Sequence, residues 1–377
     1  MRTKSILRLV LVACLITACS ANTSSLPHLS DMPCVQGSSS SGFPLRVKWC
    51  LALAQPVRTP PKIRHGIAYV RTEGELSGAT FYAIDLSTAN ILWQYETYNT
   101  MGSEPYLWDI IGNFVVLIGG EEIDTLDSVT GQLAWQRQMR YQTFQALTTD
   151  GRKLYLVMSG FAEAIDVQSG KTIWEYQGLP SHFTFRAYYD DVHSTIVIPA
   201  DHFYVLDAMS GRLVNKGEKE FPQSALDAIV YRGYLIYGDT IFDASLGTEI
   251  RALDDGTYKA PMALDETLYY FTLSGDVVSL QLGRWGRNWM YSASPLRQAV
   301  SNIATLGEHA YLVMEDDSMR AVSLSDGNEI ARWSGPTSSN TLRGNSIANV
   351  PSPALVTSND VLLASFGTNL LYAFEQR

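Results

Sequence analysis

A short motif recurs along this chain at intervals of about forty residues. It consists of two small or apolar residues, Asp, two variable residues, Ser or Thr, Gly, three further residues and Trp. The clearest copy is residues 164–174 (AIDVQSGKTIW), which follows a run of β-forming residues at 154–158 (LYLVM). A repeat of this length that holds several short strands is typical of a β-propeller with one blade per repeat.

The other copies are complete or degenerate. Residues 83–93 (AIDLSTANILW) have Ala89 in place of glycine, and residues 125–135 (TLDSVTGQLAW) are complete. Residues 205–215 and 241–251 lack Trp, residues 279–289 lack Asp, and residues 321–333 have Trp two positions late. An eighth copy begins at 372–375 (YAFE). We therefore predict an all-β fold, a single eight-bladed propeller of four-stranded blades over residues 45–377.

Each motif position has a physical role. Asp can accept backbone N–H bonds in the turn that follows it, and Gly supplies a positive φ at no steric cost. Trp can bury a large ring between neighbouring blades, which we favour over an aromatic ligand site. The structural positions are Asp85, Trp93, Asp127, Gly131, Trp135, Asp166, Gly170, Trp174, Asp207, Gly211, Asp243, Gly247, Trp289, Gly327 and Trp333.

The eighth copy has no outer strand of its own, and residues 45–54 (LRVKWCLALA) form a strand without a copy. We predict that this segment, which carries Trp49, completes the eighth blade. Such closure would remove the exposed strand edges that invite aggregation.

The N-terminus reads as an export signal. Basic residues at 2, 4 and 8 precede the apolar run 9–16 (LVLVACLI), which is too short to span a bilayer. Residues 16–19 (ITAC) resemble a bacterial lipobox, so we predict a signal peptide over 1–18 and lipidation of Cys19. The alternative is an ordinary signal peptide with an incidental cysteine. Residues 19–44 are rich in Ser, Gly and Pro and are predicted to be a flexible tether.

Cys34 and Cys50 are the remaining pair once Cys14 and Cys19 are assigned to the signal and the lipid site. In an oxidising compartment this pair favours a disulfide, worth about 3 kcal/mol in the chain-entropy model. Two free thiols are the alternative.

Charge and motifs exclude several kinds of function. The formal net charge is −10 without a Lys/Arg cluster, so nucleic-acid binding is not expected. His182, His193 and His202 fall near one repeat with several Asp residues, but their spacing matches no known ligand pattern, and we predict no metal site. No phosphate loop, calcium loop or nucleophile elbow is present, so no catalytic residue and no cofactor is assigned.

Trp108 and Trp285 fall outside the Trp position of the repeat. Off-register aromatic residues are candidate partner contacts, because Trp, Tyr and Arg are enriched at interface hot spots. Simple packing is the alternative reading of both residues.

The repeat resembles the tryptophan-docking repeat of the pyrroloquinoline-quinone-like propeller superfamily over residues 45–377. The architecture is most similar to the propeller lipoprotein of the outer-membrane barrel assembly machinery. That resemblance implies a non-catalytic scaffold that binds envelope or membrane proteins as a monomer within a complex. If the cell has two membranes, the lipid would hold the chain to the outer membrane, facing the periplasm; otherwise it would lie on the outer face of the cytoplasmic membrane. The alternative is a quinone-dependent dehydrogenase or another small-ligand propeller, which would need polar side chains converging at the axis.

Overall fold

The fold is given by a computed structural model. It describes residues 38–377 except residues 58, 74–77, 98–106, 120–121, 140–143, 182–185, 219–227, 254–260, 293–300, 335–352 and 359. The chain divides into two units, Met1–Pro33 and Cys34–Arg377, and every described residue belongs to the second. The predicted signal peptide, Cys19 and Cys34 precede residue 38 and lie outside the described residues, so the signal peptide, the lipidation and the disulfide stay predictions.

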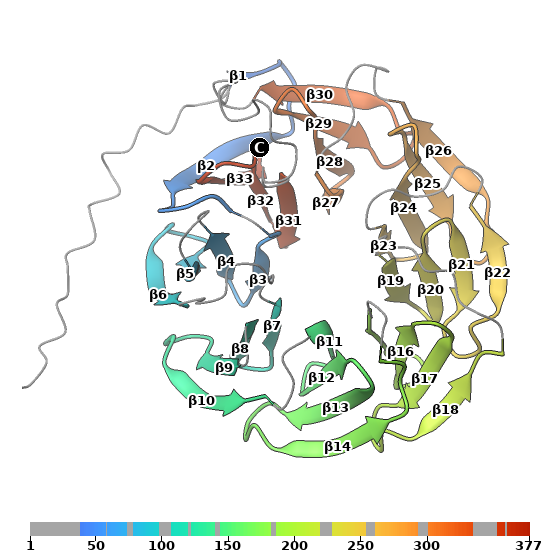
Figure 1. Ribbon diagram of the computed structural model, residues 1–377. Helices are drawn as coiled ribbons and strands as arrows, with labels where there is room; N and C mark the ends of the chain where they lie inside the picture. The colour runs from blue at the N-terminus through green and yellow to red at the C-terminus, as the bar shows by residue number, and fades with distance from the viewer. Residues whose placement is uncertain are drawn as a thin grey trace, which may run out of the picture. The chain divides into compact units, whose positions relative to one another are not determined.

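The described residues form eight antiparallel sheets arranged as the blades of one propeller (Figure 1). Blade 1 holds β3 (Lys62–Arg64), β4 (Ile67–Glu73), β5 (Ala79–Asp85) and β6 (Ile91–Glu96), and blade 2 holds β7 (Leu107–Ile111), β8 (Phe114–Gly119), β9 (Glu122–Asp127) and β10 (Leu133–Gln138). Blade 3 holds β11 (Phe144–Thr149), β12 (Lys153–Met158), β13 (Phe161–Asp166) and β14 (Thr172–Gln177). Blade 4 holds β15 (Tyr188–Asp190), β16 (Thr195–Pro199), β17 (Phe203–Asp207) and β18 (Leu213–Lys216).

Blades 5 to 7 follow the same order from the inner to the outer strand. Blade 5 holds β19 (Ala228–Tyr231), β20 (Tyr234–Tyr237), β21 (Thr240–Asp243) and β22 (Glu249–Ala252). Blade 6 holds β23 (Met262–Leu264), β24 (Thr267–Phe271), β25 (Val277–Gln281) and β26 (Arg287–Tyr291). Blade 7 holds β27 (Ala304–Leu306), β28 (His309–Val313), β29 (Ser318–Ser323) and β30 (Glu329–Ser334). Blade 8 holds β31 (Ala354–Ser358), β32 (Val361–Ser365), β33 (Leu370–Gln376) and, as its outer strand, β2 (Leu45–Ala52). The predicted eight-bladed fold is thus confirmed.

The core is a ring of layers between blades. The middle strands of the blades are almost fully buried on both faces, as in β5 and β16, because a neighbouring sheet covers each face. Eight apolar clusters lie around the ring, and each joins two adjacent blades. One of them brings Tyr69 and Phe81 of blade 1 against Val115 of blade 2. Each blade therefore buries apolar surface against both of its neighbours, which stabilises the ring.

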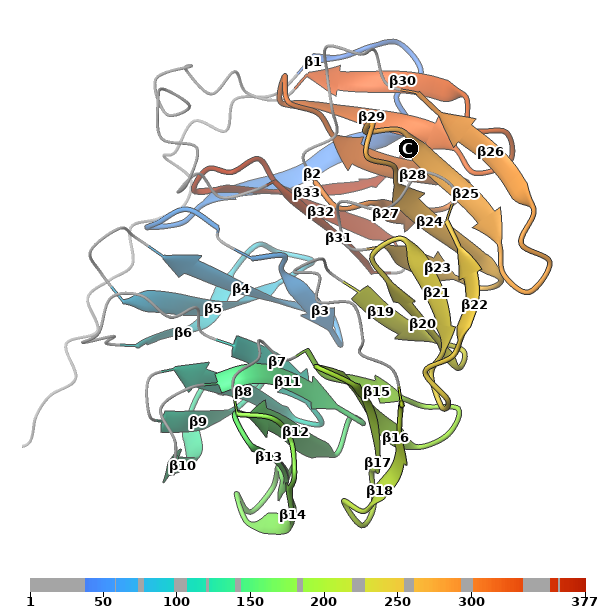
Figure 2. The same ribbon diagram turned by 45° about the vertical axis from the view of Figure 1, so that its right-hand side comes forward.

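Closure occurs as the sequence predicts. β2 pairs antiparallel with β33 from Leu45–Gln376 to Ala52–Leu370, and so completes blade 8 (Figure 2). The Trp49 indole N–H donates to the carbonyl of Leu86 on blade 1 at 2.9 Å. The N-terminal strand thus contributes both the missing ladder and the Trp of the eighth repeat.

Residues 38–44 also belong to the ring, although they precede the expected start at Leu45. β1 (Ser38–Ser39) pairs with the outer edge of β30, which makes blade 7 five-stranded. Phe43 is fully buried and meets Tyr311 of blade 7 edge-on, with ring centroids 6.3 Å apart. The segment therefore lies where the turn before the outer strand of blade 8 would be in a continuous repeat.

Candidate interaction surface

In blades 1 to 7, one face of the ring carries two turns of each blade, the turn after the first strand and the turn after the third. We call it the turn face. Backbone bonds join these turns within a blade, as in Ala208 N–H to Ser194 O at 3.0 Å and Ala244 N–H to Gly233 O at 2.9 Å. The third-strand turns are those of the sequence repeat, so the repeat itself builds this face.

The Asp residues of the repeat organise these turns. Asp166 Oδ1 accepts the Ser169 backbone N–H at 2.8 Å and its hydroxyl at 2.7 Å. Asp85 Oδ1 accepts equivalent bonds from Ser87 and Thr88. These bonds stabilise the charged form, and the Ser87 and Ser169 hydroxyls in particular hold the pKa of the Asp85 and Asp166 carboxyls below the ordinary value.

Tryptophan docks on glycine between neighbouring blades. The Trp135 indole N–H donates to the Val167 carbonyl at 2.7 Å, and its ring lies over Gly170. A Cβ at Gly170 would stand 2.9 Å from ring carbons of Trp135, at a φ of +67°. The same contact joins the pairs Trp93–Gly131, Trp174–Gly211 and Trp289–Gly327. Each indole therefore holds the turn of the next blade in place.

The junction between blades 4 and 5 departs from this pattern. Asn215 occupies the Trp position, and its side-chain amide donates to the carbonyls of Ser245 at 3.2 Å and Leu246 at 3.1 Å. The Phe203 ring covers Gly247, where an added Cβ would stand 2.3 Å from a ring carbon. Two residues thus replace one Trp at this junction. Asn215 makes the hydrogen bonds, and Phe203 supplies the aromatic side chain that covers the glycine.

At the junction between blades 5 and 6, the tryptophan comes from the following blade and not from the preceding one. Trp285 stands at the glycine position of its repeat, with a φ of 59°, and its backbone N–H bonds to Gln281 O at 2.8 Å as the glycines do. Its half-buried ring packs into the cluster between the two blades and meets Tyr234 of blade 5 edge-on. Blade 5 offers Arg251 at its Trp position. Trp285 thus lies outside the Trp position, as the sequence indicates, and fills this junction from the opposite blade. Its role as a partner contact stays a prediction.

Exposed apolar residues lie on several blades, among them Val129 and Leu133 of blade 2, and also on the turn face and outer rim of blades 4 and 5. Met209 is 79% exposed, Val214 59%, and Val192 and Leu246 57% each. We call the blade 4–5 surface the set Val192, Met209, Leu213, Val214, Leu246 and Ile250. Figure 1 shows β18 and β22, which carry part of this set, on the outer rim of adjacent blades.

Sequence reasoning missed this surface, although a signal was present. Leu246 stands where the repeat has Ser or Thr, and Ser245 takes over the hydroxyl bond to Asp243 at 2.7 Å. Met209 is an apolar residue at a solvent-facing turn position that holds Ser87 and Gln168 in two other copies and the exposed Val129 in a third. Departures from a repeat that serve no local structural need mark sites under another constraint.

Polar side chains on the inner strands of blades 1 and 2 bond to one another. Lys62 Nζ lies 2.7 Å from Asp109 Oδ1 and donates to Trp108 O at 3.1 Å. Trp108 is only 7% exposed; Phe81 packs against it, and Lys62 Nζ stands 5.0 Å from its ring centroid. Trp108 is therefore a packing residue. Its role as a partner contact stays a prediction, and its low exposure argues against that role.

The histidines of blade 4 are turn residues where they can be seen. His193 Nδ1 lies 2.5 Å from the buried Asp190, and His202 Nδ1 lies 3.1 Å from Asp201, whereas His182 is outside the described residues. Within the described ranges, no three His, Cys, Asp or Glu side chains come together as metal ligands.

The same ranges contain no helix long and apolar enough to cross a membrane. Cys50 lies half-buried on β2, and its pairing with Cys34 stays a prediction.

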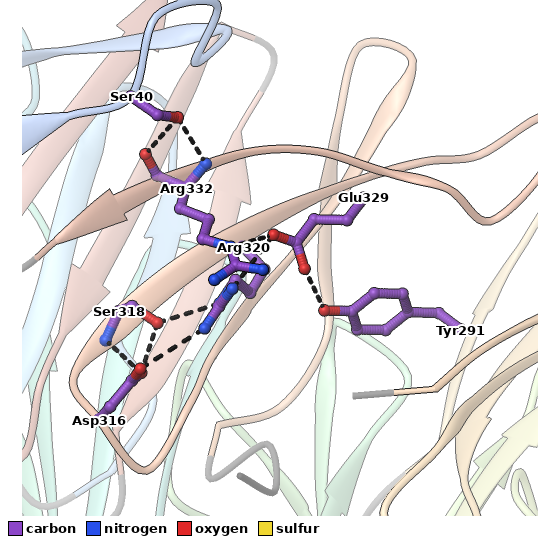
Figure 3. Close-up of polar contacts among 7 residues, drawn as sticks. All are labelled: Ser40, Tyr291, Asp316, Ser318, Arg320, Glu329 and Arg332. Carbon is purple, nitrogen blue, oxygen red and sulfur yellow. Dashed lines mark hydrogen bonds and ion pairs between the residues drawn. The ribbon is translucent and has the colours of Figure 1, made fainter. Parts of the chain in front are cut away.

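A buried arginine in blade 7 lies within a cluster of charged side chains (Figure 3). The Arg320 guanidinium, 5% exposed, lies 3.1 Å from Glu329 Oε1 and 3.5 Å from Asp316 Oδ2. Glu329 also accepts bonds from Arg332 and, at 2.7 Å, from Tyr291 of blade 6. A buried guanidinium needs such partners, so both carboxylates pair with Arg320, and Glu329 also joins blade 7 to Tyr291 of blade 6. Ser40 extends the cluster by donating to and accepting from the Arg332 backbone.

The docking of indole on glycine around an eight-bladed ring defines the chain as a propeller of the pyrroloquinoline-quinone-like class. The family model described as "Outer membrane protein assembly factor BamB" matches residues 45–213 and 109–291. The chain belongs to that family.

Solved structures agree on the fold at low sequence identity. BamB from Moraxella catarrhalis superposes with a TM-score of 0.60 at 17% identity, covering 88% of this chain and 99% of that one. The computationally designed Ika8 protein gives 0.67 at 15% identity, covering 86% and 98%. The C-terminal WD40 domain of Sif2 gives 0.60 at 12% identity, covering 88% and 98%. No curated protein sequence matches the chain.

Proposed function

We propose that this chain is an exported, lipid-anchored, non-catalytic scaffold that binds one or more envelope proteins, in the assembly of envelope or outer-membrane proteins. The docked turns carry the proposal. In blades 1 to 5 each repeat turn is held from two sides, by its Asp within the blade and by an indole or amide from the neighbouring blade. A rigid rim of this kind presents side chains to a partner at a small cost in conformational entropy. Membership of the assembly-factor family supports the same role.

The contacts at the inner strands favour a scaffold over the quinone-dependent dehydrogenase. The Lys62 ammonium and the Asp109 carboxylate pair with each other. Arg64 Nη1 donates to the Ile110 carbonyl at 3.3 Å. These described groups thus make structural bonds between blades 1 and 2, which is not the convergent arrangement that a cofactor would require.

In-cell cross-linking of the tagged full chain, followed by mass spectrometry, tests the scaffold. We expect one envelope protein in near-stoichiometric yield. Recovery of no protein, together with binding of quinone and calcium by the purified chain, would support the dehydrogenase instead.

Membrane fractionation tests the anchor separately. Cys19→Ser should move the protein from the membrane fraction to the released fraction, because the lipid is its proposed attachment. Cys14→Ser is the matched control, since that cysteine lies within the signal peptide. Retention of the Cys19→Ser protein on membranes would overturn lipid anchoring without bearing on partner binding.

A further inference from the structure

We infer that blade 5 unfolds locally before the ring separates at the place where the two ends of the chain meet. The ends meet in blade 8, where β2 pairs with β33 without a connecting loop. We call the contacts of residues 38–57 with blades 7 and 8 the closing seam. A ring held there by non-covalent contacts would be expected to open there first. The inference concerns the order of opening and does not depend on the proposed scaffold function.

Blade 5 has the shortest middle strands of the ring. Its strands β20 and β21 have four residues each, whereas the middle strands of the other blades have at least five. Its outer strand β22 and its inner strand β19 also have four. Short ladders carry fewer interstrand hydrogen bonds and bury less apolar surface, so blade 5 gains less free energy from its own folding.

Neither junction of blade 5 has an indole docked from the preceding blade. Blade 4 offers Asn215, whose amide donates to the carbonyls of Ser245 and Leu246 at 3.2 and 3.1 Å. Blade 5 itself offers the half-buried Arg251 to blade 6, and Trp285 fills that junction with a half-buried ring. An amide or a half-buried ring removes less apolar surface from water than a docked indole, so blade 5 is also held less tightly by its neighbours.

The closing seam begins with the longest strand of the ring. β2 has eight residues and pairs with β33 from Leu45–Gln376 to Ala52–Leu370. The pairing continues past the end of β2, because Leu53 N–H donates to Asn369 O at 2.8 Å and the Asn369 amide donates to Leu53 O at 2.9 Å. Further along, Val57 N–H donates to Thr368 O at 3.1 Å.

The other end of the seam extends onto blade 7. Arg377 N–H donates to Pro44 O at 3.1 Å, and the buried Phe43 packs edge-on against Tyr311 of blade 7. β1 then pairs with the outer edge of β30. The N-terminal segment is therefore bound to two blades, so separation of the seam requires the loss of the longest ladder and of the blade 7 contacts together.

Local unfolding of blade 5 would uncover apolar side chains of both neighbours while the closing seam holds. Val205 of blade 4 packs in the cluster that contains Phe242 of blade 5, and Leu268 of blade 6 packs in the cluster that contains Ile241. All four side chains are buried in the closed ring. Figure 1 shows β19 to β22 on the right of the ring, away from β2 and β33.

Hydrogen exchange of the full chain, read by mass spectrometry, tests the order of opening. We expect protection factors about tenfold or more lower for residues 234–243 of blade 5 than for residues 45–52 and 370–376 of the closing seam, because opening free energies follow local burial and hydrogen bonding. Residues 153–166 of blade 3 are the reference, since indoles dock at both junctions of that blade. Equal protection in blade 5 and the closing seam, or lower protection at the seam, would overturn the inference.

Two asparagine variants test the cause. Asn215→Ala should lower the protection of residues 234–243 about threefold or more and leave residues 370–376 unchanged, because it removes the amide that holds blade 5 from blade 4. Asn369→Ala is the matched control, since it removes a side-chain amide bond at the closing seam and should leave blade 5 the less protected region. Unchanged exchange of blade 5 in the Asn215→Ala protein would contradict the inference.

A cysteine variant separates the non-covalent contacts from the predicted disulfide. Cys34→Ser with Cys50→Ser should keep the order of opening, because the ladder, the Asn369 bonds and Phe43 all remain. If the closing seam of this folded variant exchanges before blade 5, its non-covalent contacts are insufficient and the inference fails.

Discussion

The Trp49 indole N–H donates to the Leu86 carbonyl at 2.9 Å, and this bond joins the last blade of the ring to the first. Trp49 comes from the N-terminal strand β2, whereas the indoles that dock on glycine lie on the outer strand that follows their own repeat turn; these are Trp93, Trp135, Trp174 and Trp289. The ring is therefore closed by two contacts of one strand, its ladder with β33 and its indole on blade 1.

Trp49→Phe should lower the free energy of unfolding by about 1 kcal/mol, because phenylalanine keeps an aromatic side chain and removes only the indole hydrogen bond. Trp49→Ala should lower it by about 3 kcal/mol or more, because the packing between blades 8 and 1 is also lost. Denaturant unfolding measures both. Deletion of residues 45–54 should open the ring, and an unchanged melting curve after that deletion would contradict the closure.

Gly170→Ala should destabilise the protein by about 2–4 kcal/mol. The new Cβ would stand 2.9 Å from the Trp135 ring, and alanine at positive φ costs about 1–2 kcal/mol more. Gly283→Ala is the matched control, because Gly283 has a φ of +80° and nothing within 4 Å of the added Cβ. Gly283→Ala should lower the free energy of unfolding only by the cost of alanine at positive φ. Equal losses of stability at positions 170 and 283 would argue against tight packing of Trp135 on Gly170.

Ala89→Gly should raise stability by up to about 1 kcal/mol. Ala89 occupies the glycine position of blade 1 with a φ of 64°, a conformation that glycine adopts without strain. A gain in melting temperature, measured by calorimetry, would confirm that the first repeat carries local strain. A loss would show that the alanine methyl contributes packing against the neighbouring blade.

Trp285→Gly should restore the repeat sequence but destabilise the protein by about 2–3 kcal/mol, because it empties the space beside Tyr234. Adding Arg251→Trp should recover at least half of that loss, since the new indole would come from the usual strand. The coupling is measured by a double-mutant cycle. Additive effects of the two substitutions would contradict a shared docking space.

Acid should destabilise the ring through the turn carboxylates. The folded-state pKa values of Asp85, Asp127, Asp166 and Asp207 lie below the ordinary value, chiefly through hydrogen bonds from turn Ser or Thr residues. Their contribution to stability is therefore complete above the unfolded pKa, about 4, and is lost as the pH falls through the lower folded values. Melting temperatures between pH 7 and pH 3 should show this loss. Asp166→Asn keeps an acceptor oxygen but cannot titrate, so its acid-induced loss should be smaller than that of the parent.

The repeat motif was sufficient to predict the propeller, its eight blades and its closing strand. Asp, Ser or Thr, and Gly act within a single turn, so the local sequence specifies their roles, and the spacing of about forty residues specifies the blades. The interblade position of Trp93, Trp135 and Trp174 follows as well, because a large ring on an outer strand has one apolar surface to reach.

Only the tertiary structure decided the departures from the repeat. Phe203 covers Gly247 from another strand of blade 4, and Trp285 fills a space that Arg251 leaves open on the neighbouring blade. The Leu246 turn of blade 5 meets Asn215 of blade 4 only because these two blades pack side by side. A turn is specified by residues within a few positions of one another, whereas packing between blades depends on side chains thirty or more residues apart, whose direction no local pattern records.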